Sequence, residues 1–470
     1  MAAAFAGVPA MLLLGVGGAQ ANPVAPVVVN GGAGFATAGK VLTVTNTPGA
    51  IINWQSFSIG AGETTRFVQQ SASSTVLNRV RGQDPSVILG TLSSNGRVFL
   101  INANGVVFGA GSRVDTQGLI ASTLNISDAD FRNGILRFQK EGQAGSVRVD
   151  GYVNGGTGDV YIIAPNVAVG KEGVIRSEGG KVVLAAGEKV EIGARHLNDI
   201  KFEIQAPANE AQVLGRLEGG AIGVFAGTLK HSGDIRAQVA SGEGGRIVLK
   251  AKGDLTLGAG SQTIADGTKG GQIEVRSEVG VLTVEKGAQV SASAVPAPPG
   301  VTQAAQPPAS NPPAAQATLT PAAGGSITLT AEQGPLAMQG GARIAANGVT
   351  GGQILLQARA ARVTVEGQLE ARGTAPATGG AAEPDPNARG GSIQVLGQEV
   401  VLTGQAAVDA SGDAGGGTIL IGGDYQGKTA EIQNALRTYV GQDVVLKADA
   451  LLKGDGGKVI VWADEATHFV

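Results

Sequence analysis

The sequence contains no cysteine, and only 4% of its 470 residues are aromatic. The absence of cysteine excludes disulfide scaffolds, thiol nucleophiles and cysteine-ligated zinc. Charged residues are also few, at 16%, and they nearly cancel to a formal charge of −3. A protein that binds nucleic acid needs a basic face, which this balance does not provide. No stretch beyond the amino terminus reaches the roughly 18 apolar residues that would span a bilayer. We therefore expect a protein that neither binds nucleic acid nor is integral to a membrane.

Glycine is abundant where these other residue types are scarce. The chain has 76 glycines, roughly twice the usual share. They lack the strict third-residue period of collagen, and a hydrophobic share of 43% is too high for wholesale disorder. The length exceeds the usual range of a single domain. Several domains or a repeat architecture are therefore expected.

The first residues of the chain are typical of an export signal. Ala10–Gly18 is small and apolar, and Ala19–Ala21 is a small-x-small cleavage site. This predicts a signal peptide over residues 1–21 and a mature start near Asn22. The basic region that normally precedes the apolar core is missing, which a start codon assigned too far downstream would explain. The alternative is a short apolar helix within the fold.

A recurring phrase organises the rest of the chain. It consists of two glycines, any residue, a β-branched residue, any residue and an apolar residue, and it begins at Gly179, Gly219, Gly244, Gly270, Gly324, Gly351, Gly390, Gly416 and Gly456. Each phrase predicts a tight turn followed by a short strand, with glycine suited to positive φ or close backbone approach. Four of the eight intervals are 25 to 27 residues long. A period of this size, with strands in each unit, predicts a parallel β-helix.

Two longer intervals contain runs rich in proline and alanine. Ala294–Thr320 lies inside the interval from Gly270 to Gly324, which is about twice the usual length, and Thr374–Ala388 lies inside the next long interval. Such compositions favour extended disorder. We interpret residues 294–320 and 374–388 as disordered loops, each extruded from a single coil. The 40-residue intervals from Gly179 and Gly416 contain no such run, and each fits either a larger coil or a short excursion.

The last residues form a fresh repeat strand, Val459–Ala463, with no polar cap before Val470. An exposed final coil is an aggregation hazard. We therefore expect the chain to continue beyond this sequence, or its end to pair with something else.

Residues 22–200 carry distinctive blocks in place of the plain repeat phrase. These blocks are Ile51–Gly60, Val76–Val80, Asp84–Gly90, Asn95–Gly109 and Gly118–Leu124. In these blocks the chain resembles the amino-terminal secretion domain of filamentous haemagglutinin-type exoproteins, which are exported by two-partner secretion. The resemblance runs from about Gly32 to Ile192. It divides the chain into a secretion domain over residues 22–200, the start and cap of the β-helix, and continuing β-helix repeats over residues 201–470.

The resemblance implies an all-β fold, a right-handed parallel β-helix with an amino-terminal cap. It implies export by the general secretory route, followed by recognition in the periplasm. The partner it implies is an outer-membrane barrel transporter with periplasmic binding modules. It further implies a secreted or surface-bound exoprotein of a Gram-negative bacterium, of adhesin or haemagglutinin type, with host-cell or matrix receptors or glycans as further partners.

The family carries an Asn-Pro-Asn-Gly motif that is important for secretion. Here the motif reads Asn102-Ala103-Asn104-Gly105, so the resemblance assigns recognition of the secretion partner to Asn102, Asn104 and Gly105. Asparagine tolerates turn conformations, whereas alanine in place of proline leaves φ free and loosens the turn. We expect the turn to expose both side-chain amides as donors and acceptors for the partner. The alternative is a plain corner without partner contact.

No residue is predicted to be catalytic, to bind a cofactor or to bind a metal. The acidic residues considered lie on separate strands without a repeated offset, and the histidines lack partners at metal-ligand spacing; they are Asp254, Glu274, Glu285, His196, His231 and His468. We therefore expect no enzyme and no cofactor. Two alternatives stay open: a β-helix enzyme acting on extracellular polysaccharide, which needs a clustered acid pair, and the stalk of a secreted haemolysin or contact-dependent toxin.

Overall fold

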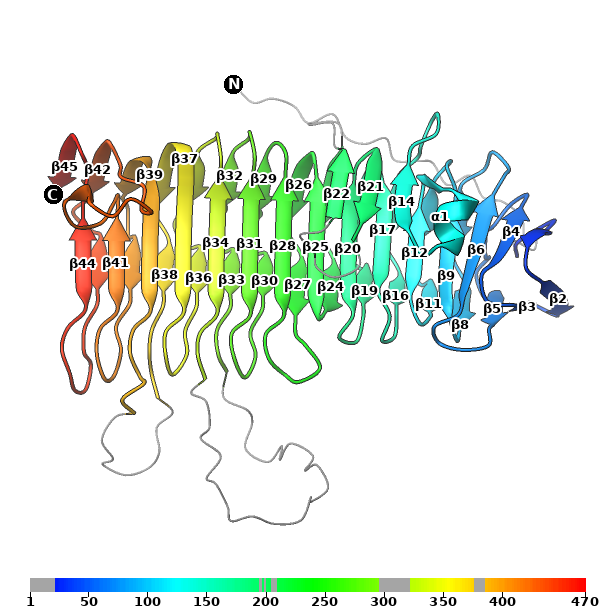
Figure 1. Ribbon diagram of the computed structural model, residues 1–470, viewed down its shortest axis with the longest axis horizontal. Coiled ribbons are helices and arrows are strands. Elements are labelled where there is room, and N and C mark those ends of the chain that lie inside the picture. The colour runs from blue at the N-terminus through cyan, green and yellow to red at the C-terminus, as the bar shows by residue number, and fades with distance from the viewer. Residues whose placement is uncertain (1–21, 194–196, 198–199, 204–208, 296–321, 376–384) are drawn as a thin grey trace, which may run out of the picture.

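The computed structural model describes residues 22–193, 197, 200–203, 209–295, 322–375 and 385–470. Short strands stack side by side into a rod, from β1 (Val27–Asn30) at one end to β45 (Ala466–Phe469) at the other (Figure 1). The predicted signal peptide and most of the two predicted loops lie outside the described residues. No helix in the described part of the chain combines the length and the hydropathy needed to cross a bilayer.

The rod is a parallel β-helix, as the repeat pattern and the resemblance predict, and its strands form three faces. On the first face, called face 1, each strand pairs in parallel with the strand of the next coil. Its members are β4 (Ala50–Trp54), β6 (Thr75–Val80), β9 (Arg97–Ile101), β12 (Leu119–Ser122), β17 (Val160–Ala164), β20 (Lys181–Ala186), β25 (Ala221–Ala226), β28 (Arg246–Ala251), β31 (Gln272–Ser277), β34 (Ser326–Ala331), β37 (Gln353–Val365), β39 (Ser392–Leu402), β41 (Thr418–Ile421) and β44 (Lys458–Val461). Every strand predicted from the nine glycine phrases is present on this face.

The strands of the other two faces stack in the same coil order as the strands of face 1. Face 2 contains β7 (Ser86–Ile88), β10 (Val106–Phe108), β15 (Val147–Val149), β18 (Val167–Val169), β23 (Glu210–Val213), β26 (Thr228–His231), β29 (Leu255–Leu257), β32 (Leu282–Val284), β35 (Leu336–Met338), the second halves of β37 and β39, β42 (Arg437–Val440) and β45. Face 3 contains β3 (Val41–Asn46), β5 (Thr64–Val68), β8 (Thr91–Ser94), β11 (Arg113–Asp115), β16 (Tyr152–Asn154), β19 (Val174–Arg176), β24 (Arg216–Gly219), β27 (Asp234–Ala237), β30 (Gln262–Ile264), β33 (Gln289–Ser291), β36 (Arg343–Ala345), β38 (Gln368–Glu370), β40 (Ala407–Asp409) and β43 (Val445–Lys447).

The interior of the rod is filled by alternate residues of each strand. In β31, Ile273 and Val275 are buried whereas Glu274 between them is only half-buried, as a period of two requires. One hydrophobic cluster runs from Leu42 to Ala448 through the described coils. The core therefore continues across residue 200, and the division of the chain there stays a prediction.

The glycine phrases exist because the backbones of successive coils approach closely. The carbonyl oxygen of Gly245 accepts a hydrogen bond from Gln272 N–H at 2.9 Å, and a Cβ on Gly271 would collide with this same oxygen. Gly325 repeats the arrangement against Gly271 one coil later. Neither Gly271 nor Gly325 has a positive φ, so close approach explains these glycines and φ does not.

The two predicted loops leave the coil order intact. On either side of residues 294–320, β33 is followed by β34, which pairs with β31 of the preceding coil in unbroken register. Likewise β39, which follows the second run, pairs directly with β37. Each run is therefore accommodated between two neighbouring coils.

An amino-terminal cap closes the first coil, as the resemblance predicts. β1 pairs antiparallel with β4, and β2 (Ala33–Ala38) pairs antiparallel with β3. The ring of Phe35 in β2 stands edge-on to Trp54 at 5.6 Å. The cap thus covers the end of the core with two strands, β1 and β2, that run antiparallel to the strands of the β-helix on which they lie.

A separate four-stranded antiparallel sheet lies over the outer side of face 1 and is called the covering sheet here. It contains β13 (Asn125–Ile126), β14 (Leu136–Gln139), β21 (Lys189–Ile192) and β22 (Ile200–Glu203), with α1 (Asp128–Arg132) beside it. Beneath it, outward residues of face 1 such as Phe99, Tyr161 and Val183 are buried in a separate hydrophobic cluster. The long interval from Gly179 therefore holds an excursion.

The long interval from Gly416 also holds an excursion. It contains the short 3-10 helix η2 (Tyr425–Gly427) and returns over face 1. Gln357 Nε2 donates to Gln433 Oε1, and Gln433 Nε2 donates to the carbonyl of Arg359, both at 3.0 Å.

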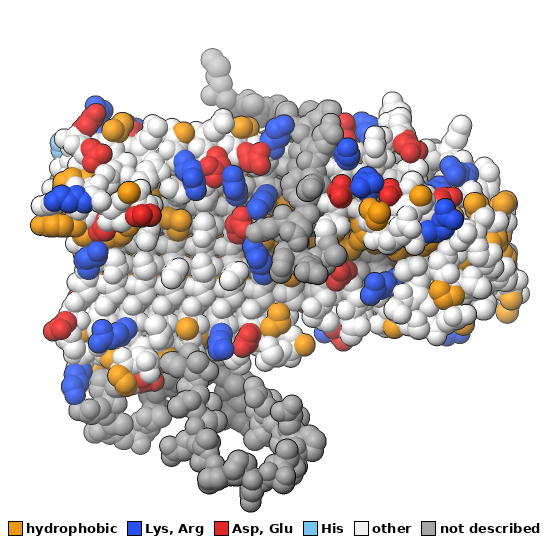
Figure 2. Space-filling model, in the orientation of Figure 1, with side chains coloured by type: hydrophobic (Ala, Val, Ile, Leu, Met, Phe, Trp, Pro, Cys, Tyr) orange, Lys and Arg blue, Asp and Glu red, His pale blue; other side chains and the backbone are white. Residues whose placement is uncertain are grey.

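Figure 2 shows charged side chains of both signs gathered in the upper half of the visible face and little charge in a pale band below them. The visible surface has no large region of a single sign.

Candidate functional site

The family motif forms the corner between β9 and β10. Gly105 N–H donates to the carbonyl of Asn102 at 3.1 Å, which closes a four-residue β-turn. Gly105 has a φ of +128°, whereas Ala103 and Asn104 have no positive φ. A type I turn favours asparagine first, proline second and glycine fourth. Ala103 thus occupies the position that suits the family's proline.

Asn102 is fully buried and uses both ends of its amide within the chain. Its Nδ2 donates to the carbonyl of Asp84 and to Ser86 Oγ, both at 3.0 Å. Its Oδ1 accepts from the backbone N–H of Asn104 at 3.0 Å and from Asn104 Nδ2 at 3.1 Å. These four bonds exhaust what one amide can form in such a site. Asn102 therefore joins two coils and shapes the turn.

Asn104 lies on the exposed tip of the turn. Its Nδ2 donates to the carbonyl of Gly82 at 2.8 Å, which fixes the orientation of the side chain. Within the described residues, its Oδ1 accepts no hydrogen bond. The tip therefore presents one oriented amide oxygen to solvent, beside the exposed methyl group of Ala103.

The expectation that both amides are exposed is wrong for Asn102. The coil stacking places the block Asp84–Gly90 directly beneath the motif, because β7 pairs with β10 and Ser86 lies opposite Val106. The block is distinctive in the sequence, but nothing in the sequence indicates a role for Ser86. Nor does the sequence indicate a role for Gly145, whose N–H donates to the carbonyl of Ala103 at 2.7 Å. Whether Asn102, Asn104 and Gly105 contact a secretion partner stays a prediction.

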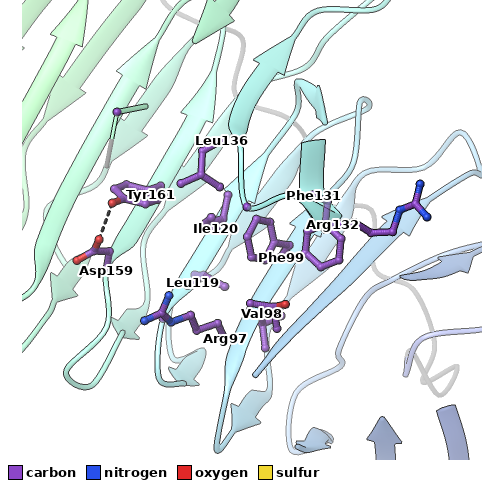
Figure 3. A pocket seen from close by; sticks show the side chains of 14 residues that line it. Arg97, Val98, Phe99, Leu119, Ile120, Phe131, Arg132, Leu136, Asp159 and Tyr161 are labelled. Carbon is purple, nitrogen blue, oxygen red and sulfur yellow. Dashed lines mark hydrogen bonds between the residues drawn. The ribbon is translucent and has the colours of Figure 1, made fainter. Parts of the chain in front are cut away.

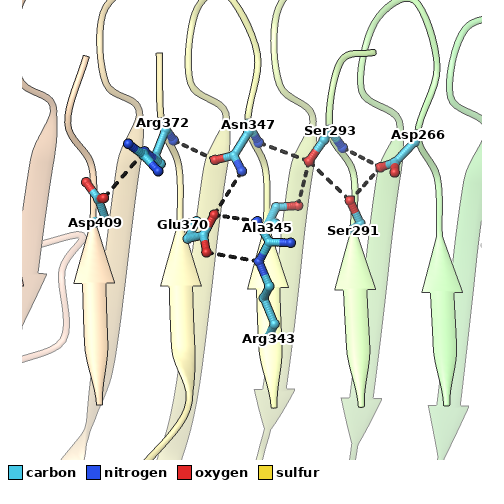
Figure 4. Close-up of polar contacts among 9 residues, drawn as sticks. All are labelled: Asp266, Ser291, Ser293, Arg343, Ala345, Asn347, Glu370, Arg372 and Asp409. Carbon is cyan, nitrogen blue, oxygen red and sulfur yellow. Dashed lines mark hydrogen bonds and ion pairs between the residues drawn. The ribbon is translucent and has the colours of Figure 1, made fainter. Parts of the chain in front are cut away.

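A ladder of polar side chains follows one corner at the end of the face 3 strands (Figure 4). In each coil a side-chain oxygen accepts a hydrogen bond from a backbone N–H of the next coil. Asp266 Oδ1 accepts from Ser293 N–H at 2.6 Å, Ser293 Oγ accepts from Asn347 N–H at 3.2 Å, and Asn347 Oδ1 accepts from Arg372 N–H at 2.8 Å. Asp409 forms an ion pair with Arg372 at 3.4 Å. The ladder satisfies backbone groups at the corner, which is a structural role.

Glu370 is the most tightly held carboxylate of this ladder. Arg343 donates to both of its oxygens, at 2.9 and 2.6 Å, and Asn347 Nδ2 donates at 3.1 Å. Burial opposes ionisation, but these hydrogen bonds outweigh it and lower the pKa of Glu370 below its usual value. A carboxylate held ionised in this way does not suit a general acid.

The other acidic candidates also have structural contacts. Asp254 Oδ1 accepts from Val281 N–H at 2.9 Å, and Glu285 Oε2 accepts from Ala259 N–H at 2.8 Å. Glu274 pairs with Lys250 at 2.9 Å. The structure does not bring these three residues together into one acid pair.

Two of the three histidines lie in the described residues, and His196 lies outside them. His231 is fully buried, and its Nε2 is 3.1 Å from the carbonyl oxygen of Gln262. Burial lowers the pKa of His231 to about 4, so the ring is neutral at pH 7. His468 is exposed on β45. Over the described ranges, no group of three or more histidine and acidic side chains is arranged to hold a metal ion.

The chain is thus an elongated β-helical protein with a cap at one end and a covering sheet on one face. Comparison with known proteins identifies its family. The model of the TPS (two-partner secretion) secretion domain matches residues 19–276, more than half of the chain. The chain therefore belongs to the two-partner secretion domain family, whose members are secreted exoproteins. This confirms the family resemblance.

Several known proteins are similar to this chain. A heme/hemopexin-binding protein of Haemophilus influenzae is 31% identical over 201 residues, which are 41% of this chain and 22% of that protein. The chain thus matches about a fifth of that relative's length. The HMW1 secretion domain of Haemophilus influenzae shares the fold, with a TM-score of 0.57, 23% identity and coverage of 93% of this chain and 100% of that one. A filamentous hemagglutinin secretion domain is more distant, with a TM-score of 0.30, 14% identity and coverage of 73% of this chain and 99% of that one.

Proposed function

We propose that this chain is exported through a dedicated outer-membrane barrel transporter. In this proposal, periplasmic modules of the transporter recognise the turn from Asn102 to Gly105. The supporting observation is the exposed, oriented amide of Asn104, which sits on a corner held by the buried Asn102. A rigid polar tip of this kind loses little entropy when a partner binds it.

The two asparagines have different roles in this proposal. Asn104 contacts the partner through its Oδ1, and Asn102 acts as a positioning residue that shapes the turn. Gly105 supplies the positive φ that lets the chain leave the corner and enter β10. The partner therefore recognises one side chain and the backbone around it.

Beyond export, we propose that the protein is a surface-associated exoprotein of adhesin type. An elongated rod suits this role, because each coil adds about 4.8 Å to its length and is stabilised by packing on its neighbours. Host-cell or matrix receptors or glycans are the partners that this role requires. The alternative of a polysaccharide-degrading enzyme is less favoured, because the carboxylates of the polar ladder and of β31 are held in ion pairs and backbone contacts.

Secretion of single variants tests the export proposal. The chain is expressed with its outer-membrane transporter, and the ratio of supernatant to periplasmic protein is measured. Asn104→Ala should lower this ratio at least several-fold while the purified variant keeps its β-sheet circular dichroism. Asn166→Ala is the matched control, because Asn166 is an exposed asparagine at the same corner, just before β18, where its Oδ1 accepts Glu210 N–H at 2.8 Å.

Two results would contradict the proposal. Undiminished export of Asn104→Ala would show that the turn is only a corner of the β-helix. An equal loss for Asn166→Ala would show that any disturbed corner impairs export, and that the motif has no special role.

A further inference from the structure

A cavity of about 350 Å3 opens between the covering sheet and face 1 (Figure 3). Its wall is formed by β9, β12 and β17 on one side and by α1 and β14 on the other. The apolar side chains that line it are Phe99, Ile120, Phe131, Leu136 and Tyr161. Phe99, Ile120 and Phe131 are each 6% exposed, and Tyr161 is 5% exposed. The floor is therefore apolar and partly aromatic, but solvent reaches it.

The edge of the cavity carries an arginine that the protein does not pair. Arg97 is exposed at the start of β9, and its side chain forms no hydrogen bond or ion pair within the described residues. Figure 3 shows its guanidinium on the same side of the cavity as Asp159. Asp159 already accepts from Tyr161 Oη at 2.5 Å and from Lys181 N–H at 2.9 Å. The five donors of Arg97 are thus available to a ligand.

The second arginine at the cavity is engaged elsewhere. Arg132 Nε donates to the carbonyl of Asp128 at 3.2 Å, and Figure 3 shows its head directed away from Phe99. A ligand would therefore meet an apolar floor, with the unpaired guanidinium of Arg97 at one side next to the Asp159 carboxylate, whose oxygens already accept hydrogen bonds from within the chain.

We propose that this cavity binds a peptide segment of the outer-membrane transporter in which an apolar side chain stands next to a carboxylate. The volume is at the lower end of ligand sites and suits one large apolar side chain. An arginine recognises a carboxylate through two parallel hydrogen bonds. This inference rests on the proposed function, since it assigns the cavity to the same partner.

The position of the cavity supports a shared partner. β9 begins at Arg97, contributes Phe99 to the cavity and ends at Ile101, directly before Asn102. Five residues of a strand span about 15 Å. One periplasmic module can therefore contact the cavity and the turn at the same time.

Binding measurements on the full chain test this inference. The probe is the intact transporter in lipid nanodiscs, and its affinity for the folded chain is measured by biolayer interferometry. Arg97→Gln should weaken binding about ten-fold, and Arg97→Glu should weaken it further. Leu136→Trp, which fills the cavity from its half-buried rim, should weaken binding to a similar degree. Arg66→Gln is the matched control, because Arg66 is an exposed arginine on β5 that is also without a partner among the described residues.

The outcomes separate the two proposals. If the unmodified chain binds and the Arg97 variants bind equally well, the cavity is not the peptide site and the export proposal stands. If the Arg66 and Arg97 variants weaken binding equally, only general charge attraction operates and the cavity proposal is overturned. If the unmodified chain does not bind the transporter, the export proposal fails and this inference fails with it. Because Arg97 is exposed, its variants report on binding even where Leu136→Trp disturbs the fold.

Discussion

The guanidinium of Arg79 and the carboxylate of Asp128 form an ion pair of 2.8 Å that ties the covering sheet to the β-helix. Arg79 lies on β6 and is almost fully buried. Its Nη2 donates to the carbonyl of Ile126 at 2.7 Å, and its Nε donates to Asn125 Oδ1 at 3.1 Å. One side chain thus holds both residues of strand β13 and the start of α1.

Replacing Arg79 should loosen the covering sheet locally. In Arg79→Met the buried carbonyl of Ile126 and the carboxylate of Asp128 lose their donor, which should cost about 2–3 kcal/mol. The measurement is hydrogen exchange of the amides from residue 125 to residue 139. Arg137→Met is the control, because Arg137 is exposed and its ion pairs with Asp130 and Glu191 are long; its cost should stay below about 1 kcal/mol. Equal exchange in the two variants would contradict this anchoring role.

The buried amide of Asn102 predicts a folding defect. Asn102→Ala removes four hydrogen bonds and leaves the carbonyl of Asp84 without its donor, which should cost about 2–3 kcal/mol. The backbone amide of Asn104, whose acceptor is lost, should exchange faster in hydrogen-exchange measurements. Asn104→Ala leaves that acceptor in place and should cost less than about 1 kcal/mol. Unchanged protection of the Asn104 amide in Asn102→Ala would refute this assignment.

Restoring the family's proline should be tolerated. Ala103 is the second residue of the turn, and its N–H donates no hydrogen bond within the described chain. Ala103→Pro should therefore stabilise the corner by about 0.4–1 kcal/mol, by restricting the unfolded chain. Asn104→Pro is the contrasting variant, because it removes the N–H that donates to Asn102 Oδ1. Thermal unfolding compares the two, and a lower midpoint for Ala103→Pro would show that its φ does not suit proline.

The glycine phrases predict that one glycine of each coil cannot be replaced by a larger residue without a large loss of stability. In Gly271→Ala, the new Cβ collides with the carbonyl oxygen of Gly245, so two coils must separate and the variant should be destabilised by more than about 2 kcal/mol. Gly340→Ala is the matched control: its Cβ would meet Glu366 only at 3.9 Å, and its φ is not positive. Hydrogen exchange around β31 compares the two variants. Equal protection in both would show that the coils separate at little cost.

Stability should depend on pH through His231. Burial lowers the pKa of this base to about 4 in the folded state, against about 6.5 in the unfolded chain. As the pH falls from 6.5 to 4, this histidine binds a proton in the unfolded state but stays neutral in the folded state. Stability therefore falls over this window, by up to about 3 kcal/mol.

The variant His231→Gln isolates this contribution. Carboxylates titrate equally in both proteins, so the difference between the two unfolding curves at pH 7, 5.5 and 4.5 reports on the histidine. The unmodified chain should lose more stability than His231→Gln between pH 7 and 4.5. Parallel losses would show that the ring does not resist protonation.

Much of the fold could be predicted from the sequence, because a β-helix repeats one local pattern. The glycine phrases predicted nine strands of face 1, from β20 to β44, and the structure contains each of them. Alternation within a strand, as from Ile273 to Val275, already shows which side chains point inward. The turn between Ile101 and Val106 was also predictable, since Asn and Gly are turn residues. All of these features depend on neighbours along the chain.

The sequence by itself thus determined the coil, its glycine corners and the place of the Asn102 turn, because each follows from residues a few positions apart. Only the tertiary structure decided which side of each feature meets solvent. Stacking places Asp84 under Asn102 and buries an amide that a corner would otherwise expose. The covering sheet, built partly from the distant strand β21, buries Phe99 from outside. Contacts across coils and between distant segments make these choices, and no local pattern encodes them.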